Sequence, residues 1–152
     1  MAGLGLARWR IHDEIPTRDG SRLDLVHVHD TKLTAFELKM AEPGQALAPL
    51  DARALRQLRH YCKAADLVYV VTVAAARRLT IAHDGQTLHL EPLEHMALPV
   101  GVGWVVFDRL TRDLTVLAPA EQQEPDTEDR AFVLDQLANR LGKAQRAIRR
   151  CR

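Results

Sequence analysis

The sequence has no excess of charge of either sign and very little cysteine. Its 152 residues include 21 lysines and arginines and 20 aspartates and glutamates, for a formal net charge of +1. Overall charge therefore does not indicate a nucleic-acid-binding protein, and only a local basic patch can do so. The two cysteines, Cys62 and Cys151, have neither CxxC nor zinc-site spacing. We expect Cys62 to be a small core residue of a cytoplasmic protein in a reducing compartment.

Long apolar runs, repeats and low-complexity tracts are also missing. No run approaches 18 apolar residues, so we expect no membrane-spanning segment. The opening MAGLGLARWR lacks the long apolar core of a signal peptide. The length predicts a single domain over residues 1–152.

The expected order of elements in the first half predicts an α/β or α+β fold with a central mixed sheet flanked by helices. A short lead-in, one or two helical turns around residues 4–11, precedes a hairpin over 22–40. Asp51 is a good N-cap for a helix over about 52–65. The apolar, β-branched run at 67–73 is typical of a central strand covered on both faces. The helix is expected to carry the chain across to this strand.

The second half is expected to contain two further hairpins and a long helix. An Asp84-Gly85 turn predicts an inserted hairpin over about 79–91, with a short helix over 74–79 before it. The runs VGWVVFD and LTVLAPA predict another hairpin. A basic helix is expected over about 128–149, with an apolar stripe that we place at Phe132, Leu134 (or Val133), Leu137, Leu141 and Ala144. This stripe can pack on its own sheet or on a second copy, so a homodimer or larger complex stays open.

The first hairpin brings charged residues opposite one another. A tight turn at Asp30 and Thr31 pairs residues whose numbers sum to 61, so Asp24 faces Glu37 near the open end. Alternation places the apolar residues Leu23, Leu25, Phe36 and Leu38 on the other face. Opposed Cβ atoms are about 4.5–5.5 Å apart, and like charges at that distance repel. A divalent cation or Lys39 can offset the repulsion; alternatively, these are the charges that edge strands carry against aggregation.

Asp24, followed by Glu37-x-Lys39 on the next strand, a helix and an apolar strand, resembles the PD-(D/E)xK superfamily of restriction-endonuclease-like nucleases. Gln57 and Tyr61, four residues apart on the helix, fit the pattern that many members show there. The resemblance covers roughly residues 8 to 73, and GVGWVVFDRLTRDLTVLAPA is similar to the closing strands of small stand-alone bacterial relatives. The family's proline before the aspartate is replaced by leucine here.

The resemblance implies a restriction-endonuclease-like core and metal-dependent hydrolysis of phosphodiester bonds in nucleic acid. DNA is favoured over RNA as the substrate, and the expected role is in repair, recombination or defence. Asp24, Glu37 and the backbone carbonyl of Leu38 would hold Mg²⁺ or Mn²⁺, with Glu14 (or else Asp13) as a further ligand. The metal would polarise the phosphoryl oxygen and lower the pKa of a bound water.

The other matching residues receive roles from the same resemblance. Lys39 would orient the attacking water or stabilise charge at phosphorus. Gln57 would hold a water or phosphate, and Tyr61 would stack or donate its hydroxyl. Phosphate contacts are expected from the basic C-terminal helix and from Arg18, Arg22, Arg53 and Arg56. Two alternatives remain: an inactive module of the same fold that binds nucleic acid or a protein partner, and an unrelated α+β protein with a chance match.

Overall fold

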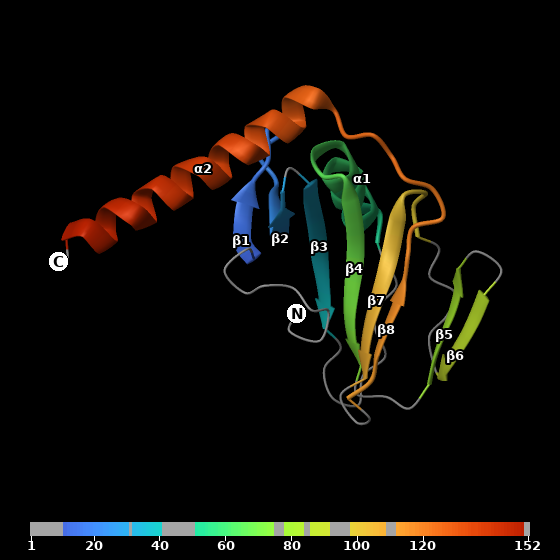
Figure 1. The fold of residues 1–152 in the computed structure, drawn as a ribbon. Helices are drawn as coiled ribbons and strands as arrows, with labels where there is room; N and C mark the ends of the chain where they lie inside the picture. The colour runs from blue at the N-terminus through green and yellow to red at the C-terminus, as the bar shows by residue number, and fades with distance from the viewer. Residues whose placement is uncertain are drawn as a thin grey trace.

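A six-stranded mixed sheet forms the centre of the computed structural model, which describes residues 11–30, 32–40, 51–74, 78–83, 86–91, 98–108 and 112–150. The strand order is β1-β2-β3-β4-β7-β8 (Figure 1). The strands are β1 (Ile11–Pro16), β2 (Arg22–His29), β3 (Lys32–Met40), β4 (Leu67–Ala74), β7 (Val102–Asp108) and β8 (Leu114–Leu117). β3, β4 and β7 are parallel, and the other neighbours are antiparallel. The expected α+β class with a mixed sheet is confirmed.

The predicted register of the first hairpin is confirmed. Val28 pairs with Leu33 and Leu25 with Phe36, so the numbers of paired residues sum to 61. One predicted face is wrong, because Leu23 packs in the main core while Leu25 packs in a second cluster with Phe36 on the other face of the sheet. The described ladder to β3 ends at Leu25. The alternation of side chains between the two faces of the sheet therefore breaks between Leu25 and Leu23.

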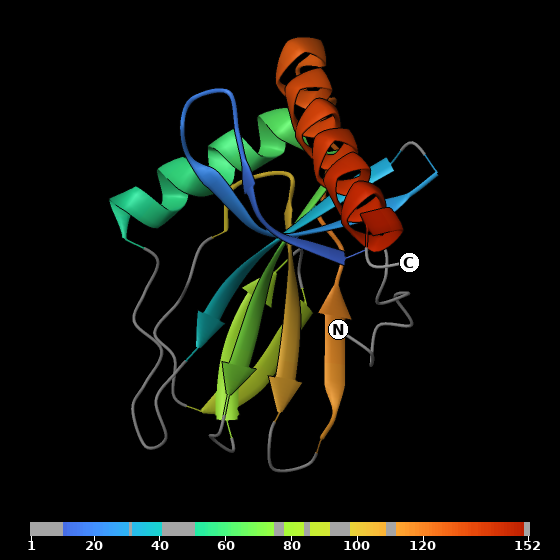
Figure 2. The ribbon, with the colours of Figure 1, turned by 90° about the vertical axis from the view of Figure 1, so that its left-hand side faces the viewer.

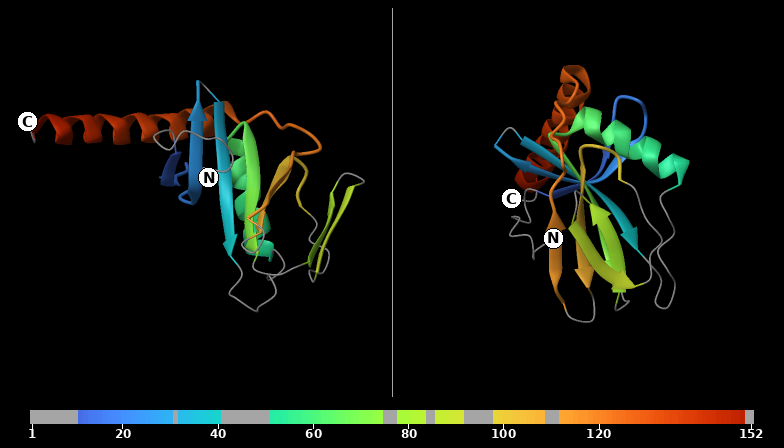
Figure 3. Two further views of the ribbon diagram at one scale, coloured as in Figure 1. Left: turned by 60° about the horizontal axis from the view of Figure 1, so that its bottom comes forward. Right: turned by 90° about the vertical axis from the view of Figure 1, so that its right-hand side faces the viewer.

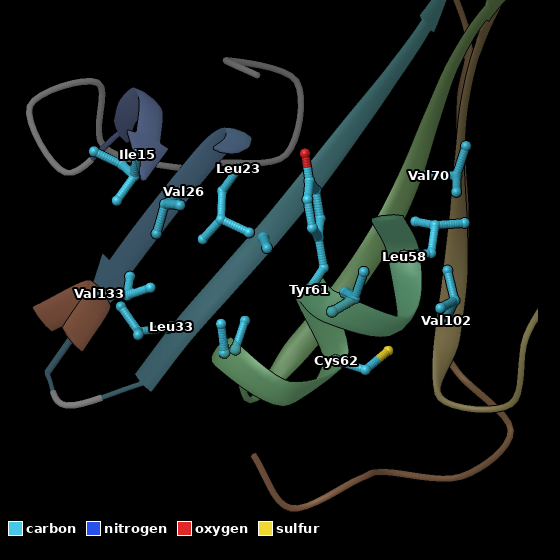
Figure 4. Packing of buried hydrophobic residues seen from close by; sticks show 14 of the residues in the cluster. Ile15, Leu23, Val26, Leu33, Leu58, Tyr61, Cys62, Val70, Val102 and Val133 are labelled. Atoms are coloured by element: carbon cyan, nitrogen blue, oxygen red, sulfur yellow. The ribbon is translucent and has the colours of Figure 1, made fainter. Parts of the chain in front are cut away.

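Helix α1 (Ala52–Ala64) begins where the sequence predicts. The Asp51 side chain accepts a hydrogen bond from the backbone N–H of Ala54 at 2.7 Å, as an N-cap should. The helix links β3 to the parallel β4 and packs its apolar side against the sheet, with Leu58 and Tyr61 fully buried (Figure 4).

Strand β4 is covered on both faces, as its β-branched run predicts. Val70 lies in the main core, and Val71 lies in the second cluster with Val105. Gly103 of β7 lets the ring of Tyr69 approach, since a Cβ there would lie 2.6 Å from that ring. These contacts hold the two central parallel strands together on both sides.

Two expectations about short helices are wrong. Ile11 does not end a helical lead-in but begins the edge strand β1, and the residues before it lie outside the described part. The helix expected over 74–79 is replaced by the end of β4 and the start of β5 (Arg78–His83). β5 pairs with β6 (Gln86–Glu91) as the predicted inserted hairpin, separate from the main sheet (Figure 3).

Helix α2 (Thr127–Arg150) matches the predicted C-terminal helix and packs on its own sheet. Val133 and Leu137 are its buried residues, and Val133 lies beside Leu33 of β3 (Figure 4). Leu141, which the predicted stripe included, is exposed. The C-terminal end of the helix extends past β1 at the sheet edge (Figures 1 and 3). The two helices run in different directions over the sheet (Figure 2). Neither helix has a described segment long and apolar enough to cross a membrane.

Candidate active site

Asp24, Glu37 and Lys39 lie together at the open end of the β2–β3 hairpin. Oδ2 of Asp24 accepts a hydrogen bond from the backbone N–H of Leu38 at 3.0 Å, so this carboxylate reaches across to β3. Nζ of Lys39 lies 2.8 Å from Oε1 of Glu37. The structure therefore places two carboxylates and a lysine in one small cluster.

Glu37 is a nearly completely buried carboxylate with only one oxygen engaged. Its residue exposure is 3%, and Oε2 has no hydrogen-bond partner among the described residues. Burial, and after it the charge of Asp24, raises the pKa of Glu37, while Lys39 and Tyr61 oppose the rise. An orphaned buried carboxylate oxygen requires an explanation, and an absent cation is one.

Tyr61 holds the strand that carries Asp24. Its hydroxyl donates to the carbonyl of Arg22 at 2.8 Å and accepts from the backbone N–H of Asp24 and from Nε2 of Gln57, both at 3.0 Å. These bonds take the place of the ladder contacts that end at Leu25. Burial, followed by the charge of Glu37, raises the pKa of Tyr61, which keeps the hydroxyl protonated.

The roles expected of Gln57 and Tyr61 change accordingly. Tyr61 is fully buried, so it cannot stack on a substrate, and its proton is committed to a backbone carbonyl. Gln57 points to the same place from one helical turn away, but one of its amide donors is used on Tyr61. Both residues therefore act first as supports for β2.

Glu14 lies level with Asp24 on the neighbouring strand. Asp13 pairs with Leu25 and Ile15 with Leu23, which puts Glu14 opposite Asp24 between them. Its backbone has φ 48°, a left-handed conformation that is uncommon for a glutamate.

The carboxylate of Glu14 is engaged elsewhere. Oε2 of Glu14 lies 3.1 Å from Nη1 of Arg22. Asp13, the second candidate, has its carboxylate 3.5 Å from Arg140, whose guanidinium also donates to the carbonyls of both acidic residues. Across the described ranges no three His, Cys, Asp or Glu side chains form a group able to hold a metal ion. That Glu14, or else Asp13, supplies a further carboxylate ligand stays a prediction.

Asp24 opens onto a cleft of about 400 Å³ between α1 and the β1–β2 end of the sheet. The lining residues are mostly charged or polar: Glu14, Asp19, Ser21, Arg22, Asp24, Arg53, Arg56, Gln57 and His60. Arg53 and Arg56 are exposed and belong to the expected phosphate contacts, as does Arg22. Arg18 is not in the cleft but pairs with Glu128 and Asp129 of α2, so its charge is neutralised there.

Comparison with known proteins adds support for the fold alone. No family model and no curated protein matches the chain. The chain is similar to a solved structure of a protein of unknown function from Silicibacter pomeroyi, with a TM-score of 0.54 and 16% identity over 91% of this chain and 78% of that one. At this identity, the likeness concerns the α+β architecture and not the chemistry of the site.

The sequence did not single out three residues that shape this region. His60 and Asp19 face each other in the cleft, and Arg140 of α2 holds the carbonyls of β1 at Asp13 and Glu14. His60 follows Arg56 by four residues and Gln57 by three, so the helical spacing puts it on their face and was a usable signal. The other two depend on contacts between distant parts of the chain.

Proposed function

We propose that the protein is a metal-dependent nuclease with a restriction-endonuclease-like core. It hydrolyses phosphodiester bonds in nucleic acid, and DNA is the favoured substrate. The observation that carries the proposal is Glu37, buried beside Asp24 and Lys39 with one carboxylate oxygen unpartnered. A purely structural glutamate at this position would be expected to satisfy both oxygens. The roles in repair, recombination or defence belong to the same proposal.

The side chains present fit Mg²⁺ or Mn²⁺. Mg²⁺ commonly binds through one or two carboxylates and completes its coordination with water and substrate phosphate. Asp24 and Glu37 supply two such carboxylates, and Oε2 of Glu37 is free to ligate. The carbonyl of Leu38, the residue after Glu37 on β3, is proposed as a further ligand. When bound, the ion would polarise the phosphate and lower the pKa of a water.

The protein's own residues would orient and hold the substrate. Lys39 brings a positive charge to the buried carboxylate and would stabilise negative charge that develops on phosphorus. Tyr61 fixes the backbone at Asp24, and the Leu38 N–H fixes its carboxylate. Arg53 and Arg56 line the approach, where phosphate contacts would give affinity that falls with salt.

Incubation of the purified protein with labelled single-stranded, duplex and branched DNA, and with RNA, tests the proposal in the presence of Mg²⁺, Mn²⁺ or EDTA. We expect metal-dependent cleavage that Asp24→Asn and Lys39→Ala each reduce by at least about 100-fold, with circular dichroism spectra like that of the wild type. Asp135→Asn on the exposed face of α2 is the matched control and should cleave normally. Equal cleavage by all variants would indicate a contaminant. Binding without cleavage by the wild type would favour the inactive module.

A further inference from the structure

A histidine–aspartate pair lies in the same cleft as Asp24. Nδ1 of His60 on α1 is 2.7 Å from Oδ2 of Asp19, which belongs to the turn between β1 and β2. Both residues line the cleft, and both side chains are more than a third exposed. The pair therefore combines a short contact with access for a substrate.

Asp19 is held in place by its own turn. Its Oδ1 accepts hydrogen bonds from the hydroxyl of Thr17 and from both the backbone N–H (3.2 Å) and the hydroxyl (2.8 Å) of Ser21. Desolvation opposes the charged form, but these bonds and the charge of His60 outweigh it, so the pKa of Asp19 is lowered. The carboxylate is thus a fixed anion, with Oδ2 left for the imidazole.

A fixed carboxylate on Nδ1 selects the state of the imidazole. In the imidazolium form both ring nitrogens carry a proton: the Nδ1 proton points toward Asp19, and the Nε2 proton has no hydrogen-bond acceptor within the described residues. A carboxylate that holds the ring in this way is the usual means of orienting a histidine for proton transfer. Nε2 is therefore available to a group bound in the cleft.

The rest of the cleft surrounds His60 with charge of both signs. Arg53 and Arg56 share its helix, Glu14 comes from β1, and Arg22 and Asp24 come from β2. Hydrolysis of a phosphodiester requires an attacking water on one side of the phosphorus. On the opposite side it is helped by a group that donates a proton to the departing oxygen. The Asp24 cluster can serve the first, and His60 can serve the second.

We propose that His60 is a further catalytic residue, which donates its Nε2 proton to the oxygen that leaves phosphorus, and that Asp19 is its positioning residue. This inference rests on the proposed nuclease function. In the step, a water oxygen bonds to phosphorus, the bond from phosphorus to the leaving sugar oxygen breaks, and the Nε2 proton passes to that oxygen. The attacking water releases one proton to solvent, and His60 regains one from solvent.

Substrates with a changed leaving atom test the proposal. When sulfur replaces the bridging 3′ or 5′ oxygen at the cleavage position of the DNA, the leaving group departs as a thiolate. A thiolate needs no proton to leave. On normal DNA we expect His60→Gln and Asp19→Asn to lower kcat by about 100-fold or more, the range for general acids. Of the two sulfur substrates, one carries the sulfur at the atom that leaves. On that substrate, the kcat of both variants should stay within about threefold of the wild-type value.

The chain offers a control of the same chemistry. Nδ1 of His29 lies 3.3 Å from Asp30 in an exposed pair at the β2–β3 turn, away from the cleft. His29→Gln should cleave both kinds of DNA at the wild-type rate. An unchanged KM in His60→Gln is the second expected sign.

Three outcomes would decide against the role. Equal slowing of normal and sulfur-substituted DNA would make His60 a binding or folding residue, and no slowing would remove it from the site. If the variants fail to fold, the wild-type protein alone can be tested by the solvent deuterium isotope effect on kcat. An effect of equal size on normal and on sulfur-substituted DNA overturns the proposal. Failure of the nuclease proposal itself looks different, because the wild type then cleaves neither substrate.

Discussion

Removal of one buried hydroxyl should destabilise the strand that carries Asp24. Tyr61→Phe keeps the aromatic ring in the core and deletes only the oxygen that bonds to the Arg22 carbonyl, the Asp24 N–H and Gln57. Because Tyr61 is fully buried, water cannot easily replace that oxygen. The Gln57 amide lies at the cleft and can turn to solvent.

The expected cost follows from the two backbone groups left without a partner. A buried donor or acceptor that loses its hydrogen bond costs about 1–3 kcal/mol. With two such groups, one of them near the cleft, we expect the free energy of unfolding to fall by about 2–4 kcal/mol. The cleavage rate should fall too, since Asp24 would lose its backbone support.

Urea unfolding followed by circular dichroism measures the change, with Tyr69→Phe as the matched control. Tyr69 is half-buried on β4, and its hydroxyl has no hydrogen bond among the described residues, so its loss should cost less than about 0.5 kcal/mol. A Tyr61→Phe protein as stable as the Tyr69→Phe protein would refute the view that the Tyr61 hydroxyl holds β2.

Three further outcomes are expected. Burial raises the pKa of Glu37 above 4.5, so the folded state binds its proton more tightly and metal-free stability should fall as pH rises through that window; Glu37→Gln should flatten this slope in urea titrations at several pH values. Burial raises the pKa of Cys62 to about 11, so in a Cys151→Ser background iodoacetamide at pH 8 should modify Cys62 only after urea unfolding; rapid labelling of the native protein would contradict its burial. Gly103→Ala should lower the free energy of unfolding by about 1–3 kcal/mol, because the new Cβ meets the Tyr69 ring and the Leu117 carbonyl; an unchanged urea midpoint would mean that this packing yields easily.

Local rules predict the parts of the fold that depend on neighbours in sequence. The turn at Asp30 fixes the hairpin register, and Asp51 fixes the start of α1, because each depends on a few adjacent residues. The clustering of Asp24 with Glu37 lies just past the end of the described ladder, where the Asp24 carboxylate accepts from the backbone N–H of Leu38. The predicted stripe of α2 includes both of its buried residues, Leu137 and the alternative Val133, but it also includes Leu141, which is exposed.

Contacts between distant segments explain what the sequence did not show. Leu23 changes face because a side chain from α1, Tyr61, replaces the ladder at this point. The sequence predicts Glu14 as a metal ligand and Arg18 as a phosphate contact. In the structure each side chain forms an ion pair, with Arg22 and Glu128 respectively, that no sequence pattern indicates. The edge strand β1 was overlooked because it is short and follows no recognisable turn signal.

Binding of Mn²⁺, followed by electron paramagnetic resonance, tests the central claim most directly. The wild-type protein should bind Mn²⁺ through Asp24 and Glu37, and Mg²⁺ should compete for the same site. Asp24→Asn and Glu37→Gln should each weaken binding by about tenfold or more, the scale on which loss of a supporting group lowers metal affinity, while Asp135→Asn should bind as the wild type does. No bound Mn²⁺ in the wild type, or equal binding by all four proteins, would contradict a metal site at the buried Glu37 carboxylate.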